Sequence, residues 1–288
     1  MKIEVFDERR CILGEGPASL GQQNSLISWV DIYDNKVLWQ NLLNATTGSF
    51  DVADQVGFAL PRKDEGWILG IGDQLVLRDH LGNEESIGKC YSSETGVSVP
   101  TPVRWNDAKV APNGELFAGS MPRSGESASG SLYRISDEGR SIQTLLTSVG
   151  ISNGLDWNVG GDKFFYIDTR TYRVDRFNYS EKGISDREEF IKFDPEGGLP
   201  DGMCMDIEDG LWIAFCGGGR IERYTSEGKL SEVIEMPIKN VTSCCFGGEL
   251  LDQLFVTSAF VTEEDNPQSG MTFTFHPGVT GKKTAVFN

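Results

Sequence analysis

Histidine is scarce in this 288-residue chain. Only His80 and His276 are present, and neither lies in a nucleophile motif. A Ser-His-Asp triad and a three-histidine zinc site both need histidines that the chain does not supply. The sequence therefore favours chemistry that is carried by side-chain oxygen atoms.

Long apolar runs and an excess of basic residues are also missing. No window reaches the length of a membrane span, and the opening MKIEVF has neither a long apolar core nor a cleavage signature. The net charge of −17 disfavours nucleic acid or an anionic membrane as a partner, because basic surface is the main source of such affinity. We expect a cytoplasmic protein, a monomer or weak homodimer, that binds small polar or neutral ligands.

The cysteines lack a metal-binding or redox spacing. None of the six forms a C-x-x-C pair, and they are scattered through apolar segments. Reduced, buried thiols are the expectation, with disulfides or a thiolate metal site as the alternative.

The feature that is present is a repeat. A small or polar residue precedes each apolar hairpin by roughly nine to eleven residues. The pairs are Glu15 and Leu26, Gly57 and Gly66, Asn106 and Glu115, Asn153 and Lys163, Asp201 and Gly210, and Thr242 and Gln253. The hairpins begin roughly forty to fifty residues apart, which is the spacing of four-stranded propeller blades.

The repeat predicts an all-β, six-bladed β-propeller that spans residues 1–288 as a single domain. The first strand of each blade lines a central channel. The N-terminal KIEVF strand would complete the sixth blade beside Thr272 to Phe275 or Thr284 to Phe287, which would remove a free edge. Two β-sandwiches are the alternative, but they would not explain why the polar residues precede the hairpins by a nearly constant number of residues.

The nearly constant offset between these residues and the hairpins that follow them predicts a site in the channel. Equivalent positions on the inner strands point to one axis, so Glu15, Asn106, Asn153 and Asp201 should meet. Two carboxylates and two amides suit a hard divalent cation, which would also keep both carboxylates charged. The alternative for Asn153 and Asp201, each followed by glycine, is that they are tight-turn residues.

Separated motifs in the same order resemble the regucalcin/senescence marker protein/gluconolactonase family. They are LGEGP (13–17), WVDI (29–32), RWNDAKV (104–110) with PNGELFAGSM, SNGLDW (152–157), PDGMCMD (200–206) and VTSCCFGGELLDQLFVTSA (241–259). The resemblance covers nearly the whole chain. It implies a six-bladed propeller with one divalent metal at the channel mouth, and the hydrolysis of sugar lactones.

Motif by motif, the resemblance implies roles for five residues. Glu15, Asn153 and Asp201 correspond to the metal ligands, and the ion is Ca²⁺, Zn²⁺, Mn²⁺ or Mg²⁺. Arg104 and Asn106 correspond to the residues that hold the sugar hydroxyls and lactone oxygens; a surface charge is the alternative for Arg104. The cation would polarise the carbonyl and activate water, and Asp201 would take the proton as general base.

Two further expectations concern neighbouring positions. Strict strand alternation places Asp107 on the face opposite Asn106, so Asp107 receives little functional weight. After Met121, where some relatives have an acidic substrate contact, this chain has Pro122-Arg123-Ser124 at the start of the Pro122 to Gly130 loop. An acidic sugar lactone and a differently shaped aldonolactone are the two alternatives for the substrate.

The rival hypotheses keep the same cation. One is a non-catalytic, calcium-binding regulatory propeller, since fold does not fix function. The other is a hydrolase of other esters or phosphoesters. The pairing of the metal triad with Arg104 and Asn106 favours the lactonase (a carboxylic ester hydrolase), because a pure ion site does not need an arginine beside the cation.

Overall fold

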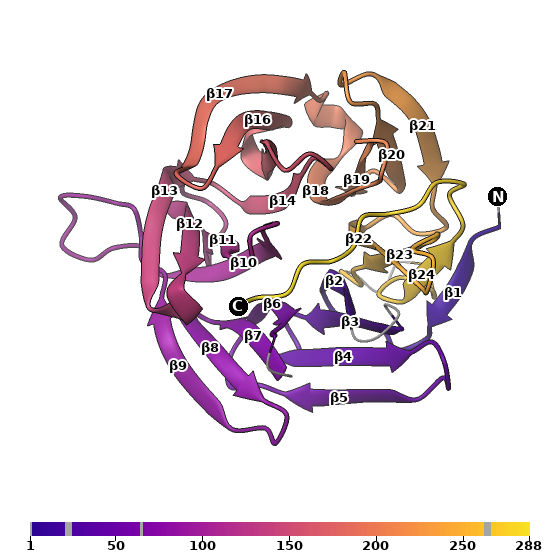
Figure 1. The fold of residues 1–288 in the computed structure, drawn as a ribbon, viewed down its shortest axis with the longest axis horizontal. Coiled ribbons are helices and arrows are strands. Elements are labelled where there is room, and N and C mark those ends of the chain that lie inside the picture. The colour runs from indigo at the N-terminus through magenta and orange to yellow at the C-terminus, as the bar shows by residue number, and fades with distance from the viewer. Residues whose placement is uncertain (1, 21–24, 64–65, 262–265) are drawn as a thin grey trace.

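The computed structural model describes residues 2–20, 25–63, 66–261 and 266–288, and it contains six four-stranded antiparallel sheets around a central channel (Figure 1). The predicted all-β, six-bladed propeller is confirmed. Across the described ranges the only helices are short 3-10 turns: η2 (Asp137–Gly139), η3 (Thr169–Thr171) and η4 (Pro195–Gly197). In those ranges no helix has the length and apolar character needed to cross a membrane.

Within each blade the strands are ordered from the channel outward. Blade 1 consists of β2 (Gly14–Leu20), β3 (Leu26–Asp31), β4 (Lys36–Asn41) and β5 (Thr47–Asp51). Blade 2 consists of β6 (Val56–Pro61), β7 (Gly66–Ile71), β8 (Gln74–Asp79) and β9 (Glu84–Lys89). Blade 3 consists of β10 (Val103–Val110), β11 (Leu116–Pro122), β12 (Gly130–Ser136) and β13 (Ser141–Val149).

The second half of the ring repeats this order. Blade 4 consists of β14 (Ser152–Trp157), β15 (Lys163–Asp168), β16 (Arg173–Ser180) and β17 (Gly183–Lys192). Blade 5 consists of β18 (Leu199–Met205), β19 (Leu211–Cys216), β20 (Arg220–Tyr224) and β21 (Leu230–Glu235). Blade 6 consists of β22 (Val241–Gly247), β23 (Gln253–Ser258), β24 (Thr272–Phe275) and β1 (Glu4–Asp7).

The ring is closed by the N-terminal strand. β1 pairs antiparallel with β24, with Val5 opposite Phe273. Of the two predicted partners, Thr272 to Phe275 is therefore the right one. The other segment, Thr284 to Phe287, joins no blade as a strand, because the chain from residue 279 onward runs across the channel (yellow in Figure 1).

This C-terminal segment ties several blades together across one end of the channel. Its backbone bonds are Ile207 N to Thr280 O (3.0 Å), Gly281 N to Leu251 O (2.8 Å), Phe287 N to Pro61 O (3.0 Å) and Asn288 N to Gly114 O (3.1 Å). The contacts reach blades 5, 6, 2 and 3, so the segment fastens parts of the ring that β-pairing alone does not join.

Every inner strand shares one irregularity. The pairing register shifts between Glu15 and Ala18, Val56 and Phe58, Trp105 and Ala108, Asn153 and Leu155, Pro200 and Met203, and Val241 and Ser243. Such bulges bend a strand and re-aim its side chains, and they are common next to functional sites. In each inner strand the register shift falls at the residue that precedes the hairpin in the sequence repeat.

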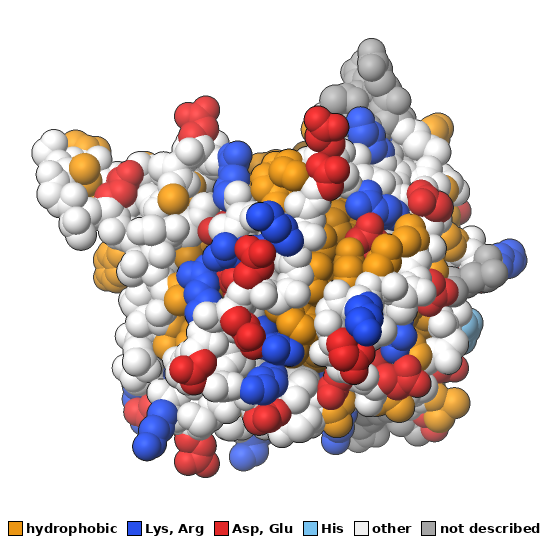
Figure 2. Space-filling view, turned by 90° about the horizontal axis from the view of Figure 1, so that it is seen from above, with side chains coloured by type: hydrophobic (Ala, Val, Ile, Leu, Met, Phe, Trp, Pro, Cys, Tyr) orange, Lys and Arg blue, Asp and Glu red, His pale blue; other side chains and the backbone are white. Residues whose placement is uncertain are grey.

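Aromatic side chains pack the blades against one another and hold the inner strands in place. Trp105 is fully buried and lies edge-on to Phe58 of blade 2 (6.2 Å between centroids) and Tyr133 of its own blade (5.2 Å). Edge-to-face pairs add about 0.5–1.5 kcal/mol beyond the burial of their area. Cys11, Cys90, Cys204, Cys244 and Cys245 are buried thiols, as predicted, whereas Cys216 is only half-buried. Figure 2, an edge-on view, shows acidic and basic side chains intermixed around exposed apolar surface.

Candidate metal and substrate site

The residues predicted to meet in the channel are brought together from four blades. Glu15 lies on β2, Asn106 on β10, Asn153 on β14 and Asp201 on β18, and each is less than a tenth exposed. The carboxyl groups of Glu15 and Asp201 are close enough to shift each other's pKa, and Asn106 Nδ2 donates to Asn153 Oδ1 at 3.3 Å.

Burial and mutual repulsion disfavour two charged carboxylates here. Burial is the largest cause that raises the pKa of Glu15, to about 8, and the charge of Asp107 adds to it. The Gly16 amide, which donates to Glu15 Oε2 at 2.9 Å, acts in the opposite direction. The pKa of Asp201 is also raised well above its usual value, by burial and then by Glu15. A divalent cation between the two groups would remove this penalty.

A chain of hydrogen bonds sets the orientation of Asn153. Its Nδ2 donates to Thr169 Oγ1 at 2.9 Å, and Thr169 Oγ1 donates to Pro200 O at 2.8 Å. The amide oxygen accepts from Asn106 and is available as a ligand on the channel side. Since the oxygen of an amide suits the same hard cations as a carboxylate, Asn153 fits the donor set.

The predicted set of metal ligands needs the side-chain amide of Asn153 as its third member. Throughout the described part of the chain, no group of three or more His, Cys, Asp or Glu is placed to hold a metal ion. Glu15, Asp201 and the amide oxygen of Asn153 together supply three oxygen donors, and their role as the metal ligands stays a prediction.

Arg104 is a buried neighbour of this site and not a surface charge. Its side chain donates from Nη1 to Asn106 Oδ1 at 2.7 Å and to Trp105 O at 2.8 Å, and the residue is 3% exposed. Burial lowers the pKa of Arg104, whereas Tyr33 and Glu15 act to raise it. A guanidinium remains charged in proteins, so the site holds a fixed positive group beside the carboxylates.

The expectation for Asp107 was wrong. Because the register shifts between Trp105 and Ala108, Asp107 does not follow strict alternation, and its side chain lines the channel cavity. Burial raises the pKa of Asp107 to about 6, against the opposing effects of Lys109 and the Ala108 amide. Strand periodicity could not reveal this residue, because a bulge leaves no mark on the pattern of apolar residues.

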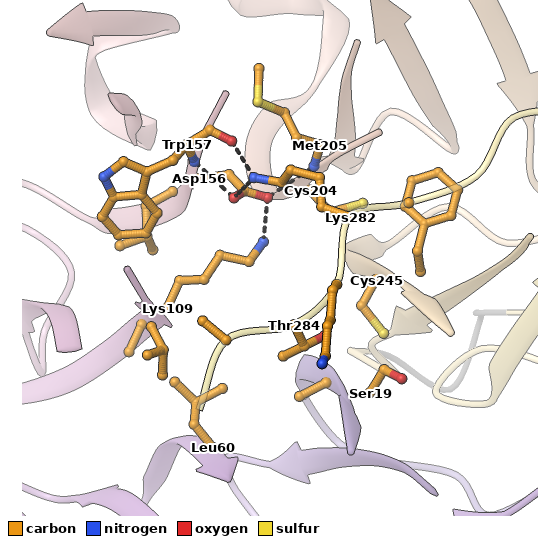
Figure 3. Close-up of a pocket in the computed structure, with 18 of the residues that line it drawn as sticks. Ser19, Leu60, Lys109, Asp156, Trp157, Cys204, Met205, Cys245, Lys282 and Thr284 are labelled. Atoms are coloured by element: carbon orange, nitrogen blue, oxygen red, sulfur yellow. Dashed lines mark hydrogen bonds and ion pairs between the residues drawn. The ribbon is translucent and has the colours of Figure 1, made fainter. Parts of the chain in front are cut away.

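Beyond the carboxylates the channel widens into a cavity of about 830 Å³, which the C-terminal segment borders. Figure 3 shows Lys109 and Lys282 converging on Asp156. The Lys109 ammonium lies 2.8 Å from Oδ2 of Asp156 and the Lys282 ammonium 2.6 Å from Oδ1. Burial alone would raise the pKa of Asp156, but the two ammonium groups outweigh it and bring the pKa to about 2. This cluster, which the sequence analysis missed, ties the C-terminal segment to blades 3 and 4.

Comparison with known proteins adds a family match. Residues 13–260 match the model of the "SMP-30/Gluconolactonase/LRE-like region". Regucalcin from Gallus gallus is 35% identical over 267 residues, which are 90% of this chain and 87% of the relative. Regucalcin from Danio rerio is 31% identical over 283 residues, 95% of this chain and 93% of the relative.

A solved structure agrees with these matches. A regucalcin from Agrobacterium tumefaciens, described as a calcium-binding protein, superimposes with a TM-score of 0.89 at 26% identity and covers 99% of this chain and 96% of its own. The propeller and the order of its blades are thus shared along nearly the full length of both chains.

Proposed function

The chain belongs to the SMP-30/gluconolactonase/LRE-like family, and from this premise we propose that it is a metal-dependent hydrolase that opens a sugar lactone to the sugar acid. The observation that carries the proposal is a buried pair of carboxylates, Glu15 and Asp201, with the Arg104 guanidinium beside them. The pair fits a cation, and the guanidinium fits the oxygens of a substrate.

Glu15, Asn153 and Asp201 would hold the cation. When bound, a divalent ion supplies Lewis-acid polarisation of the carbonyl and a lowered pKa for water. Oxygen ligands exclude none of Ca²⁺, Zn²⁺, Mn²⁺ and Mg²⁺ strictly. The description of the Agrobacterium tumefaciens regucalcin as calcium-binding supports Ca²⁺ among them.

Side chains of the site would orient the substrate and transfer the proton. Arg104 and Asn106 orient the lactone through its oxygens, and Asp201 accepts a proton as the oxygen of water forms a bond to the carbonyl carbon. The bond between that carbon and the ring oxygen then breaks. Asp201 returns the proton to the ring oxygen, which becomes a hydroxyl. The carboxylic acid formed ionises, so each turnover releases one proton to the solvent.

A non-catalytic cation-binding protein is the second candidate, and the name of the same bacterial relative favours it. An ion site alone gives no reason to bury a guanidinium against Asn106. A hydrolase of other esters or phosphoesters would use the same groups, and only the substrate distinguishes it.

The test is proton release from five- and six-membered sugar lactones, simple esters and phosphoesters, with and without a chelator. We expect turnover of lactones that chelation abolishes and Glu15→Gln strongly reduces. Glu235→Gln is the matched control, because Glu235 is exposed on the outer strand β21. Lack of metal-dependent turnover of every lactone would favour the cation-binding candidate.

A further inference from the structure

Cys204 and Cys244 bring two thiols into contact across the boundary between blades 5 and 6. Cys204 lies on β18 and Cys244 on β22, and their sulfur atoms are 3.5 Å apart. The two inner strands approach closely beside this pair, because a Cβ atom at Gly202 would lie 2.9 Å from the Cα of Ser243. The strands are therefore close enough for a covalent bond between their side chains.

A disulfide between Cys204 and Cys244 needs only a small movement. Since a disulfide bond is about 2.0 Å long, the sulfur atoms must approach each other by about 1.5 Å from their present contact. Cys244 Sγ also donates to Trp212 O at 3.6 Å, and this bond would be given up on oxidation. A thiol is a weak donor, so little hydrogen bonding is lost.

A small oxidant can reach the pair from the cavity inside the channel. Cys204, Cys244 and Cys245 all border the space of about 830 Å³, and Figure 3 shows Cys204 and Cys245 on its wall. Cys204 and Cys244 are only 4% and 2% exposed, so a bulky reagent or another protein cannot approach their sulfur atoms. Access of this kind selects a small oxidant such as a peroxide.

The groups around the pair set how fast it reacts. Burial is the largest cause that raises the pKa of Cys204 well above its usual value, and Cys244 adds to it. The Lys109 ammonium acts in the opposite direction, and Asp156, which Lys109 and Lys282 pair with, acts to raise the pKa. Because the thiolate is the nucleophile, oxidation is slow at neutral pH. The pair therefore responds to sustained exposure to an oxidant and is otherwise reduced.

We propose that Cys204 and Cys244 are a site of oxidative modification, at which hydrogen peroxide converts the two thiols into a disulfide that joins blades 5 and 6. The Cys204 thiolate attacks one peroxide oxygen, the O–O bond breaks, and the hydroxide that leaves takes up the thiol proton as water. Cys244 then attacks the sulfenic sulfur, the S–O bond breaks, and a second water leaves. The two thiols lose two electrons and two protons, and the peroxide is reduced to two waters. The inference does not depend on the proposed function.

The test treats the full-length protein with hydrogen peroxide at about pH 8, where more of the thiol is ionised, and alkylates the remaining thiols after unfolding. We expect two of the six thiols to disappear and dithiothreitol to restore them. Because the new bond restricts the unfolded chain, oxidised protein should unfold at a higher urea concentration than reduced protein. Cys204→Ala should keep every remaining thiol. Cys90→Ala is the matched control, since Cys90 is a buried thiol just after β9, and it should still lose two.

Peptide mapping of the oxidised wild type identifies the bond without any variant that has to fold. Fragmentation of the linked peptides should join Cys204 to Cys244. A bond between the adjacent Cys244 and Cys245 would overturn the inference. So would six thiols that survive prolonged treatment with peroxide, loss of a thiol pair in Cys204→Ala, or a urea midpoint that oxidation does not raise.

Discussion

Glu15 and Asp201 belong to blades 1 and 5, yet their buried carboxyl groups interact with each other inside the channel, and each acts on the pKa of the other. A carboxyl pair of this kind shares a proton when no cation is present, because two buried negative charges at contact are costly.

Cation binding should release protons. The pKa of Glu15 is about 8 without a cation, so at pH 7 the group is mostly protonated and must lose its proton to become a ligand. Apparent affinity should rise with pH through about pH 8 and level off only when Asp201, whose pKa is also raised, has lost its proton as well. Calorimetry in two buffers of different ionisation enthalpy measures the released protons. Proton release that is zero and affinity that is constant from pH 6 to 9 would contradict the raised pKa.

Asp201→Asn should separate ligation from proton transfer. The amide keeps one oxygen ligand, so the cation still binds at raised concentration, but the proton acceptor is lost. Loss of a general base typically costs about 10²- to 10⁴-fold in rate, so kcat should stay low at saturating metal. Glu15→Gln, also a change of ligand, serves as the comparison. Recovery of wild-type kcat by Asp201→Asn would show that Asp201 is a ligand alone.

Arg104→Ala should leave the cation bound and impair the use of substrate. The change removes the partner of Asn106 Oδ1 and leaves a buried acceptor unsatisfied, at a cost of about 1–3 kcal/mol in the free energy of unfolding. Metal content should stay near that of the wild type, whereas kcat/KM should fall, mainly through KM. Metal analysis, kinetics and denaturant unfolding belong in one experiment. Metal loss as complete as in Glu15→Gln would mean that the roles are assigned wrongly.

The C-terminal segment should contribute to stability through Lys282. Lys282→Met leaves buried Asp156 with only one of its two ammonium partners, and the expected loss is about 1–3 kcal/mol in the free energy of unfolding. Lys283→Met changes the adjacent, exposed lysine and should be nearly neutral. Urea denaturation compares the two variants. Equal stability of both variants would show that the segment is held by its backbone bonds instead.

Acid should weaken the same contact. The pKa of Asp156 falls from 3.8 to about 2 in the folded chain, so its contribution is fully present above about pH 4 and disappears as the pH falls toward 2. A shift of this size corresponds to stability on the order of 2 kcal/mol. Unfolding measured from pH 5 to pH 2 should show a smaller loss in Asp156→Asn than in the wild type.

The propeller and the meeting of Glu15, Asn106, Asn153 and Asp201 could be predicted from the sequence. Strand alternation and turn residues are local signals, and when they recur at a constant offset they place equivalent positions on one axis. The choice of Glu15, Asn153 and Asp201 as metal ligands, and the role of Arg104, came from the family resemblance and not from the repeat, and these roles stay predictions.

Asp107 and the ion pairs of Asp156 and Arg123 depended on the tertiary structure. A bulge turned Asp107 into the channel, and apolar periodicity carries no record of a one-residue shift in pairing. Lys282 meets Asp156 across 126 residues of chain, and Arg123 meets Asp54 across 69. Such pairs form only because ring closure sets neighbouring blades and the returning C-terminal segment side by side, and no local preference of these residues specifies those distances.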